Sequence, residues 1–137
     1  PKSLDSLVLS RNRLETVKPL ERLDSLEKLS LSHNQLHEIP QVSRCWQLKE
    51  LRLNNNSITS IPQGSLPPGL QLLDLGKNPI IRLEDLSGIS GLRNLRSLNL
   101  GGCPVASLDK LAELLATLPR LQTFNNQPHP KTRKKMQ

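Results

Sequence analysis

Aromatic residues are almost missing from this sequence: its 137 residues include no tyrosine, one tryptophan and one phenylalanine. A core without rings has to be aliphatic, and 35% apolar content over this length suffices for one domain with a continuous core. No apolar run approaches the ~18 residues of a membrane span, and no signal-peptide pattern opens the chain. We therefore expect an intracellular protein without membrane contact, in the nucleus, nucleolus or cytoplasm. Because the chain begins with Pro1, a preceding segment could carry its own address.

The motifs that accompany catalysis are also lacking. No G-x-S-x-G elbow is present, and Lys77 follows a glycine without the Ser or Thr, or the spacing from Gly69, that a phosphate loop needs. His33, His37 and Glu38 straddle a predicted strand-to-turn corner, so they are interpreted as solvated loop residues and not as metal ligands. The sequence predicts no enzyme, no cofactor, no metal site and no small-molecule substrate.

Leucine, in contrast, is abundant and regularly spaced. Five segments match L-x-x-L-x-L-x-x-N/C-x-L, and their starts are separated by 22, 22, 22 and 25 residues. They begin at Leu4, Leu26, Leu48, Leu70 and Leu95. A decayed sixth copy, LQTFNNQPHP, begins at Leu121. Such a period is typical of repeat architectures, and the sequence resembles the leucine-rich repeat family over residues 4–127.

Each repeat predicts one short strand. The leucines of its L-x-L pair, for example Leu51 and Leu53, alternate with polar residues at the period of two that a half-buried strand requires. Successive strands are joined by a dozen or more residues, so they should be parallel. With the resemblance, this predicts an α/β fold: a right-handed leucine-rich repeat solenoid, a horseshoe fragment, with a parallel β-sheet on the concave face and 3₁₀ turns, short helices and loops on the convex face.

The connections between the strands refine this expectation. Apolar residues spaced by threes from Leu83 to Leu95 favour 3₁₀ turns, and SLDKLAELLATLP predicts a helix with Ser107 as its N-cap and Pro119 at its end. The segment IPQGSLPPG is unsuited to a long helix or a central strand. Short periods with such connections resemble the intracellular class typified by a regulatory subunit of type 1 protein phosphatase. LPRLQTFNNQ resembles the C-terminal cap of that class, whereas no N-terminal cap is visible.

One polar slot recurs where each strand ends. It holds Asn12, Asn34, Asn56, Asn78 and Cys103. A side-chain amide there can donate to and accept from unpaired backbone groups of the turn, and the resemblance implies a ladder along the solenoid that also admits cysteine. Asn56→Ala should therefore lower stability by ~1–3 kcal/mol without abolishing binding. Cys45 falls in an apolar row, and both cysteines are predicted to be reduced thiols.

Side chains that flank the L-x-L leucines form columns across the concave face, the usual binding surface of solenoids. The candidate protein-binding residues are Lys28, Ser30, Glu50, Arg52, Asn54, Leu72, Asp74, Ser97 and Asn99. Leu72 is expected to be an exposed aliphatic, and Arg52 and Asp74 could pair with each other or engage a partner. The alternative is that these columns are only solvated. Trp46, on the convex side, could anchor a partner, but is favoured as a cover over the edge of the core.

The C-terminal segment PHPKTRKKMQ, residues 128–137, is basic and predicted to be disordered after a repeat domain of residues 1–127. Its charges are Lys131, Arg133, Lys134 and Lys135. They could form a nuclear import signal, a phosphate-binding tail or a solubilising end. The leading hypothesis is a non-catalytic protein-protein interaction module, a scaffold subunit of a larger intracellular assembly. The alternative is a ribonucleoprotein factor, for example in ribosome assembly or splicing, whose tail contacts RNA.

Overall fold

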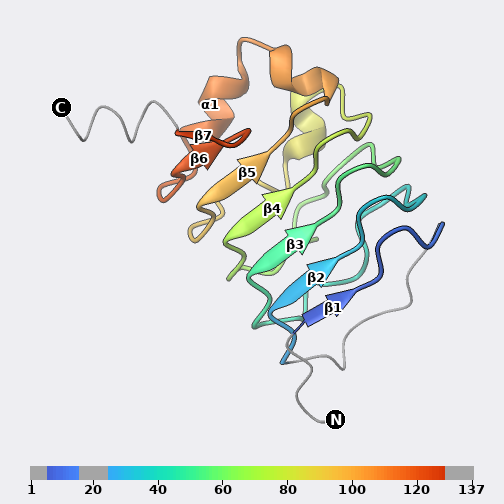
Figure 1. Cartoon of the computed structure of the whole chain (residues 1–137). Helices are drawn as coiled ribbons and strands as arrows, with labels where there is room; N and C mark the ends of the chain where they lie inside the picture. Colours follow the sequence, from blue (N-terminus) through green and yellow to red (C-terminus); the bar gives the residue numbers. More distant parts are fainter. Residues whose placement is uncertain (1–5, 16–24, 129–137) are drawn as a thin grey trace.

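The computed structural model describes residues 6–15 and 25–128, and its strands form one sheet in the order of the chain (Figure 1). The strands are β1 (Ser6–Val8), β2 (Lys28–Ser30), β3 (Glu50–Arg52), β4 (Leu72–Asp74), β5 (Ser97–Asn99), β6 (Thr123–Phe124) and β7 (Gln127–Pro128). β1 to β6 are parallel, and β7 turns back antiparallel to β6. The predicted leucine-rich repeat solenoid with a parallel sheet is confirmed.

The strands stack in the register that the repeat predicts. The central column runs through Val8, Ser30, Arg52, Asp74 and Asn99. The column before it runs through Ser6, Lys28, Glu50, Leu72, Ser97 and Thr123. The longer fourth repeat keeps this register because its extra length is taken up by the 3₁₀ helix η1 (Leu83–Leu86), away from the strands.

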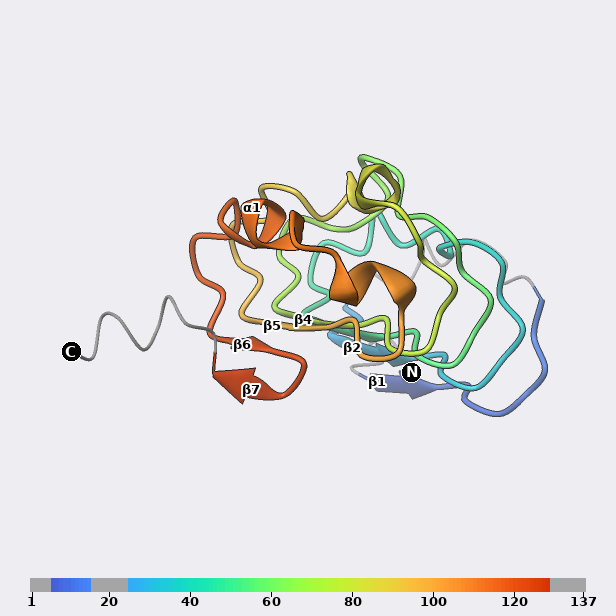
Figure 2. The same ribbon diagram turned by 90° about the horizontal axis from the view of Figure 1, so that it is seen from above.

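Aliphatic side chains from every repeat share one core. Leu29, Leu51, Leu73 and Leu98, the middle residues of their strands, are at most 1% exposed. Figure 2 shows the sheet on one side of this core and the helical connections on the other. The leucines that open the later repeats, from Leu26 to Leu121, and apolar residues of the connections belong to the same buried cluster. A repeat is therefore stabilised by its neighbours, as in other solenoids.

The convex face consists of loops and short helical pieces. The 3₁₀ helix η1 agrees with the spacing of apolar residues by threes, and residues 61–69 form neither helix nor strand, as expected. No helix in the described part of the chain is long and apolar enough to cross a membrane.

The helix predicted to begin after Ser107 is wrong in its start and length. The structure has a second 3₁₀ helix, η2 (Pro104–Ser107), and then the five-residue helix α1 (Leu111–Leu115). Pro104 stands at the start of η2, so Ser107 is already the last residue of that turn, and its hydroxyl donates to the Pro104 carbonyl. Lys110 takes the N-cap position of α1 without a side-chain hydrogen bond.

The recurrent asparagines bind the turns of successive repeats to one another. Asn34 Nδ2 donates to the carbonyls of Leu9 and Leu31 at 3.0 and 2.9 Å, and its Oδ1 accepts from the N–H groups of Asn12 and Leu14. Asn56 and Asn78 donate to the corresponding carbonyls one and two repeats further on.

The two ends of this series differ from its middle. Asn12 is exposed and donates to Ser10 O within its own turn, because no strand precedes β1 in the described residues. At the other end, the Cys103 thiol donates to Leu75 O at 3.1 Å. Burial raises the pKa of the Cys103 thiol, and both Cys103 and Cys45 are buried thiols outside any disulfide.

The residue immediately before each ladder position has a left-handed backbone. The φ values are 61° for Arg11, 57° for His33, 60° for Asn55, 56° for Lys77 and 83° for Gly102. Only glycine adopts this region without a steric cost. The turn that delivers the asparagine inward therefore sets the conformation at this slot, whatever residue occupies it.

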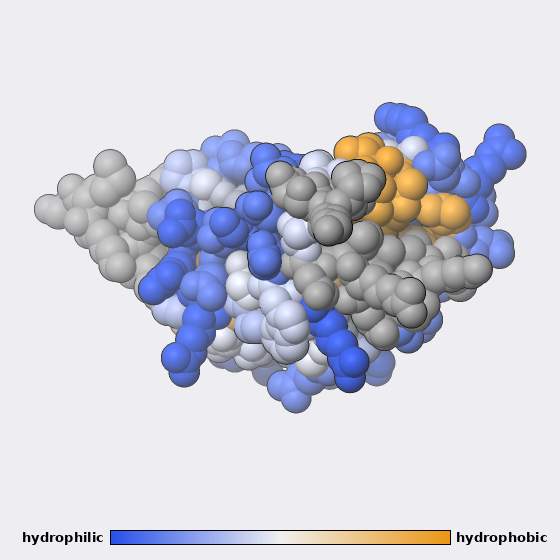
Figure 3. Space-filling view, turned by 90° about the horizontal axis from the view of Figure 1, so that it is seen from below, coloured by the Kyte–Doolittle hydropathy of each residue, from blue (hydrophilic) through white to orange (hydrophobic). Residues whose placement is uncertain are grey.

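The two ends of the sheet close differently. At the β6 end, the antiparallel hairpin carries the pairing to Pro128, one residue past the domain limit drawn from the sequence. Seen from the β1 end, the surface formed by the described residues is mostly hydrophilic with one apolar patch (Figure 3). β1 itself has an exposed Val8 and a partly buried Leu7. The first repeat is thus less buried than the middle ones.

Candidate functional site

Glu50 lies between two cations on the concave sheet. Its Oε1 accepts a hydrogen bond from Arg52 Nη1 at 2.9 Å, and its Oε2 lies 3.6 Å from Lys28 Nζ. The hydrogen bond from Arg52 is the main cause that lowers the pKa of the Glu50 carboxyl below its ordinary value of 4.5; partial burial opposes it and the charge of Lys28 adds to it. Arg52 therefore pairs with Glu50 on its own strand and not with Asp74, a pairing that the sequence had left open.

Asp74 and Asn99 form a second polar pair, one and two strands further on. Asn99 Nδ2 donates to Asp74 Oδ1 at 2.9 Å, and the same oxygen accepts the Gly76 N–H at 3.0 Å. Asn99 Oδ1 in turn accepts the Gly101 N–H at 2.9 Å. Gly76 has no Cβ, and one built there would lie 3.2 Å from Asp74 Oδ1. The two glycines thus let the side chains fold back onto the strand ends, which fixes both side chains at the surface.

Hydroxyl groups continue this network toward both ends of the sheet. Ser10 Oγ lies 2.9 Å from Ser30 Oγ and 3.0 Å from Ser32 Oγ, and Thr123 Oγ1 donates to Ser97 Oγ at 2.9 Å. Beside the strands, Asn54 donates to Asn55 Oδ1 at 2.9 Å. Of the nine residues expected on this face, Leu72 alone has an apolar side chain and so makes no side-chain hydrogen bond.

Two expectations about apolar side chains are corrected. Leu72 is half-buried and not an exposed aliphatic, because it lies between Glu50 and Ser97 in its column. Trp46 is 64% exposed, so it does not cover the core. The sequence analysis did not single out Val8, which is 67% exposed in the central column. The sequence could have indicated this exposure, since Val8 occupies the outward position that Ser30 and Arg52 occupy in later repeats.

The polar side chains of the concave face form an ordered network across several strands. Its charges and amides are held in fixed positions by hydrogen bonds, with donors and acceptors still open to solvent. No group of three or more His, Cys, Asp or Glu side chains that could hold a metal is present in residues 6–15 and 25–128. The basic residues Lys131, Arg133, Lys134 and Lys135 lie outside the described residues.

Two protein-family models match the sequence. A model of the leucine rich repeat matches residues 47–105, and a model of leucine rich repeats in two copies matches residues 2–44 and 24–68. No curated protein matches the sequence significantly. The likeness to the phosphatase regulatory subunit is not confirmed by these findings and stays a prediction.

Solved structures share the fold. A chain in the Drosophila melanogaster SNF/U2A′ complex is 27% identical, with a TM-score of 0.82 over 95% of this chain and 78% of that one. A chain of the TLR13–ssRNA13 complex is 30% identical, with a TM-score of 0.75 over 89% of this chain but 18% of that one. The Leptospira interrogans leucine-rich repeat protein LIC12759 is 31% identical, with a TM-score of 0.58 over 88% of this chain and 36% of that one. With its five matching repeats and its stacked parallel strands, the chain belongs to the leucine-rich repeat family.

Proposed function

We propose that this chain is a non-catalytic protein-binding module, a scaffold subunit of a larger intracellular assembly, that binds its partner through the concave sheet. The observation that supports this proposal most is the ordering of polar side chains on that face. Lys28, Glu50 and Arg52 hold one another, and Asp74 and Asn99 do the same. Side chains that are already fixed lose little conformational entropy when a partner binds.

The chemistry of the face indicates the kind of partner segment it fits. Glu50 is neutralised by its two cations, so the charges left for a partner are the outer donors of Lys28 and Arg52 and the second oxygen of Asp74. Val8 offers an exposed apolar contact at one end. A helix or loop with both carboxylate and amide groups, and an aliphatic side chain toward β1, would complement this arrangement.

The test exchanges charges on the concave face and on a control pair. Arg52→Glu with Asp74→Lys keeps the net charge and should release the partner while the far-UV circular dichroism stays that of the wild type. The control is Arg82→Glu with Asp85→Lys, since these residues form an ion pair at 3.4 Å on the convex side. Both variants and the wild type are affinity-purified from native cells, and co-purifying proteins are identified by mass spectrometry. Equal recovery with the concave variant would refute binding through this face.

The alternative function is a ribonucleoprotein factor. It is supported by the likeness to a chain of the SNF/U2A′ complex and to TLR13, which was solved with ssRNA13, and by the basic residues 131–135. A role of this kind would place the protein in the nucleus or nucleolus. Removing residues 129–137, which leaves the β6–β7 hairpin intact, should then reduce RNA recovery, and nuclease treatment should release co-purifying proteins. A partner set that survives both changes would contradict this alternative.

A further inference from the structure

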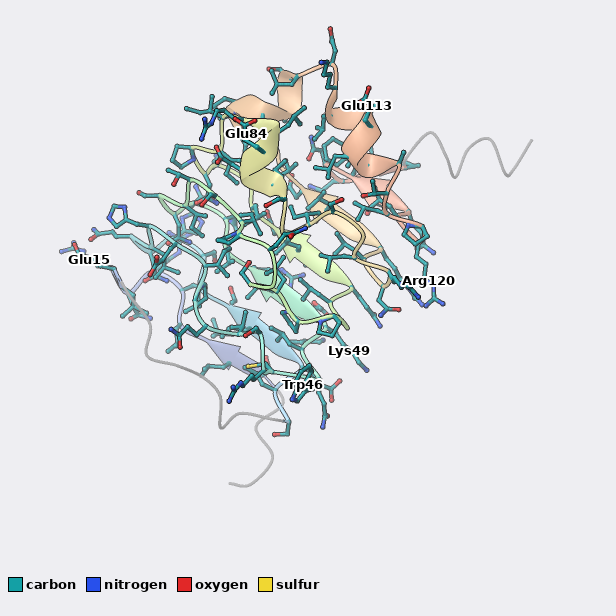
Figure 4. The ribbon with its side chains drawn as sticks, turned by 180° about the vertical axis from the view of Figure 1, so that it is seen from behind. Glu15, Trp46, Lys49, Glu84, Glu113 and Arg120 are labelled. Carbon is teal, nitrogen blue, oxygen red and sulfur yellow. The ribbon has the colours of Figure 1, made fainter. Side chains whose placement is uncertain are left out.

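A second charged surface follows the side of the sheet where the chain enters each strand. We call it the strand-entry edge and define it by six residues that flank the leucines opening the repeats, outside the columns of the concave face. They are Glu27, Trp46, Lys49, Arg93, Arg96 and Arg120. Figure 4 shows Trp46, Lys49 and Arg120 along one side of the solenoid, away from Glu84 and Glu113 on the helical connections. The edge is thus a surface separate from the concave columns.

Backbone hydrogen bonds fix the spacing along this edge. The N–H of Gln71 donates to Lys49 O, and the N–H of Arg96 donates to Gln71 O, both at 2.8 Å. With strands ~4.8 Å apart, the backbones at Lys49 and Arg96 are about 10 Å apart. Arg120 Nη1 donates to Asn94 Oδ1 at 3.1 Å, so its side chain is oriented by the preceding repeat. The backbone positions along the edge therefore rise regularly from strand to strand, and the Arg120 side chain is held by the repeat before it.

The positive charge of this row is largely uncompensated. Of its members, Lys49 pairs with Glu27 at 3.5 Å, and no ion pair within the described residues includes Arg93, Arg96 or Arg120. All three arginines are exposed. Elsewhere, Lys28 and Arg52 share Glu50, and on the convex face Arg82 lies next to two carboxylates. An excess of free guanidinium groups attracts a polyanion.

Trp46 adds a flat apolar surface to the same edge. It is the only tryptophan of the chain, and 64% of it is exposed. Guanidinium groups bind phosphate oxygens through paired hydrogen bonds, and an exposed ring provides a platform on which a base can stack. An acidic peptide would pair with the arginines equally well, but its carboxylates would not stack on the ring.

We propose that the strand-entry edge binds single-stranded RNA, with phosphates on Arg93, Arg96 and Arg120 and a base stacked on Trp46. This proposal rests on the ribonucleoprotein alternative and moves its RNA contact from the tail to the folded domain. From β3 to β6 the edge spans three strand spacings, ~14 Å, which corresponds to about four nucleotides. Recognition by phosphates and one stacked base makes binding tolerant of sequence and sensitive to salt.

The experiment titrates the full chain into a fluorescein-labelled eight-nucleotide oligouridylate and follows anisotropy at several salt concentrations. Arg93→Glu with Arg96→Glu should weaken binding at least ~10-fold at low salt and reduce the slope of log K against log salt by about 1.4, or ~0.7 for each lost phosphate. The matched control, Lys77→Glu with Lys110→Glu, changes the net charge equally at exposed positions off the edge. The emission of Trp46, the single tryptophan, should change on adding unlabelled oligouridylate to the wild type and the control.

Each contrary result has its own meaning. Equal weakening by the edge variant and its control, with unchanged Trp46 emission, would overturn the edge while leaving RNA binding by residues 131–135 in place. No binding by the wild type at low salt would overturn both the edge and the ribonucleoprotein alternative. A polyglutamate peptide of equal charge that binds more tightly than the oligonucleotide, with the same loss in the edge variant, would replace RNA by an acidic protein segment.

Discussion

Asn78→Ala should destabilise the solenoid more than any other single replacement in the asparagine series, because it removes several buried hydrogen bonds. The side chain of Asn78 is 2% exposed, and its Oδ1 accepts the buried Ile58 N–H at 3.0 Å. Its Nδ2 donates to Leu53 O and Leu75 O at 3.0 and 2.9 Å. Replacement by alanine removes all of these hydrogen bonds from a site that water does not reach.

The magnitude depends on which backbone groups lose their last partner. Leu53 O keeps the amide of Asn56, and Leu75 O keeps the Cys103 thiol. Within the described residues the Ile58 N–H has no other hydrogen-bond partner, so it would be left buried and unpaired. A buried unsatisfied group costs ~1–3 kcal/mol, and each weakened carbonyl contact adds a smaller amount, so the expected loss is ~2–4 kcal/mol.

The assay is equilibrium unfolding in urea followed by far-UV circular dichroism, because the exposed Trp46 is a poor reporter of the core. With a slope of about 2 kcal/mol per molar urea, the midpoint should fall by ~1–2 M. Asn12→Ala is the matched control: Asn12 is exposed and its side-chain amide donates only to Ser10 O within its own turn, so the loss of stability should stay below ~0.5 kcal/mol. An unchanged midpoint for Asn78→Ala, or an equal loss in both variants, would refute the reasoning.

Two further predictions follow from the turns and from the concave charges. Gly102→Ala should cost ~1–2 kcal/mol in urea unfolding, because its φ of 83° is unfavourable for alanine and the new Cβ would lie 3.0 Å from Lys77 Cγ; Gly69→Ala, where the nearest atom is 3.6 Å away, should cost clearly less, and equal costs would contradict the role of the turn. Glu50 has a pKa below its ordinary 4.5 in the folded protein, so its stabilising effect is complete above that value and is lost as pH falls through the lowered pKa. The stability advantage of the wild type over Glu50→Gln should therefore shrink on acidification, and parallel acid curves for the two proteins would show that Arg52 and Lys28 contribute nothing through this carboxyl.

The strand register could be predicted from the sequence because it depends on spacing alone. Leucines at a constant interval place Leu29, Leu51, Leu73 and Leu98 at equivalent depths, and the residues beside them then fall into columns. The partner of Arg52 could not be predicted this way. Its guanidinium has Glu50 two residues back on its own strand and Asp74 directly across, and the sequence does not say which carboxylate is already engaged. The structure shows Asp74 engaged with Asn99 and Gly76.

The exposure of residues outside the repeated leucine and asparagine positions could not be predicted from the sequence either. Trp46 stands two residues before Leu48, where the equivalent residues are Pro68 and Arg93, so the period assigns no apolar role to that position. Hydrophobicity alone would place a large aromatic ring in a core. This position of the repeat faces outward, however, so Trp46 is exposed. The same slots, at the flanks of the opening leucines, carry the arginines of the strand-entry edge. The period is therefore enough to give the spacing of this surface, although the sequence analysis did not single it out.

The two proposed surfaces should respond differently to salt, and this follows from how their charges are balanced. On the concave face, Glu50 pairs with both Lys28 and Arg52 and offsets part of their charge before any partner arrives, so association there depends more on hydrogen bonds and shape. On the strand-entry edge, Arg93, Arg96 and Arg120 have no carboxylate partner in the described structure, so association with a polyanion would release counterions. The two proposals together give the solenoid two separate binding surfaces. Salt would then detach the partner of the edge while that of the sheet remains bound.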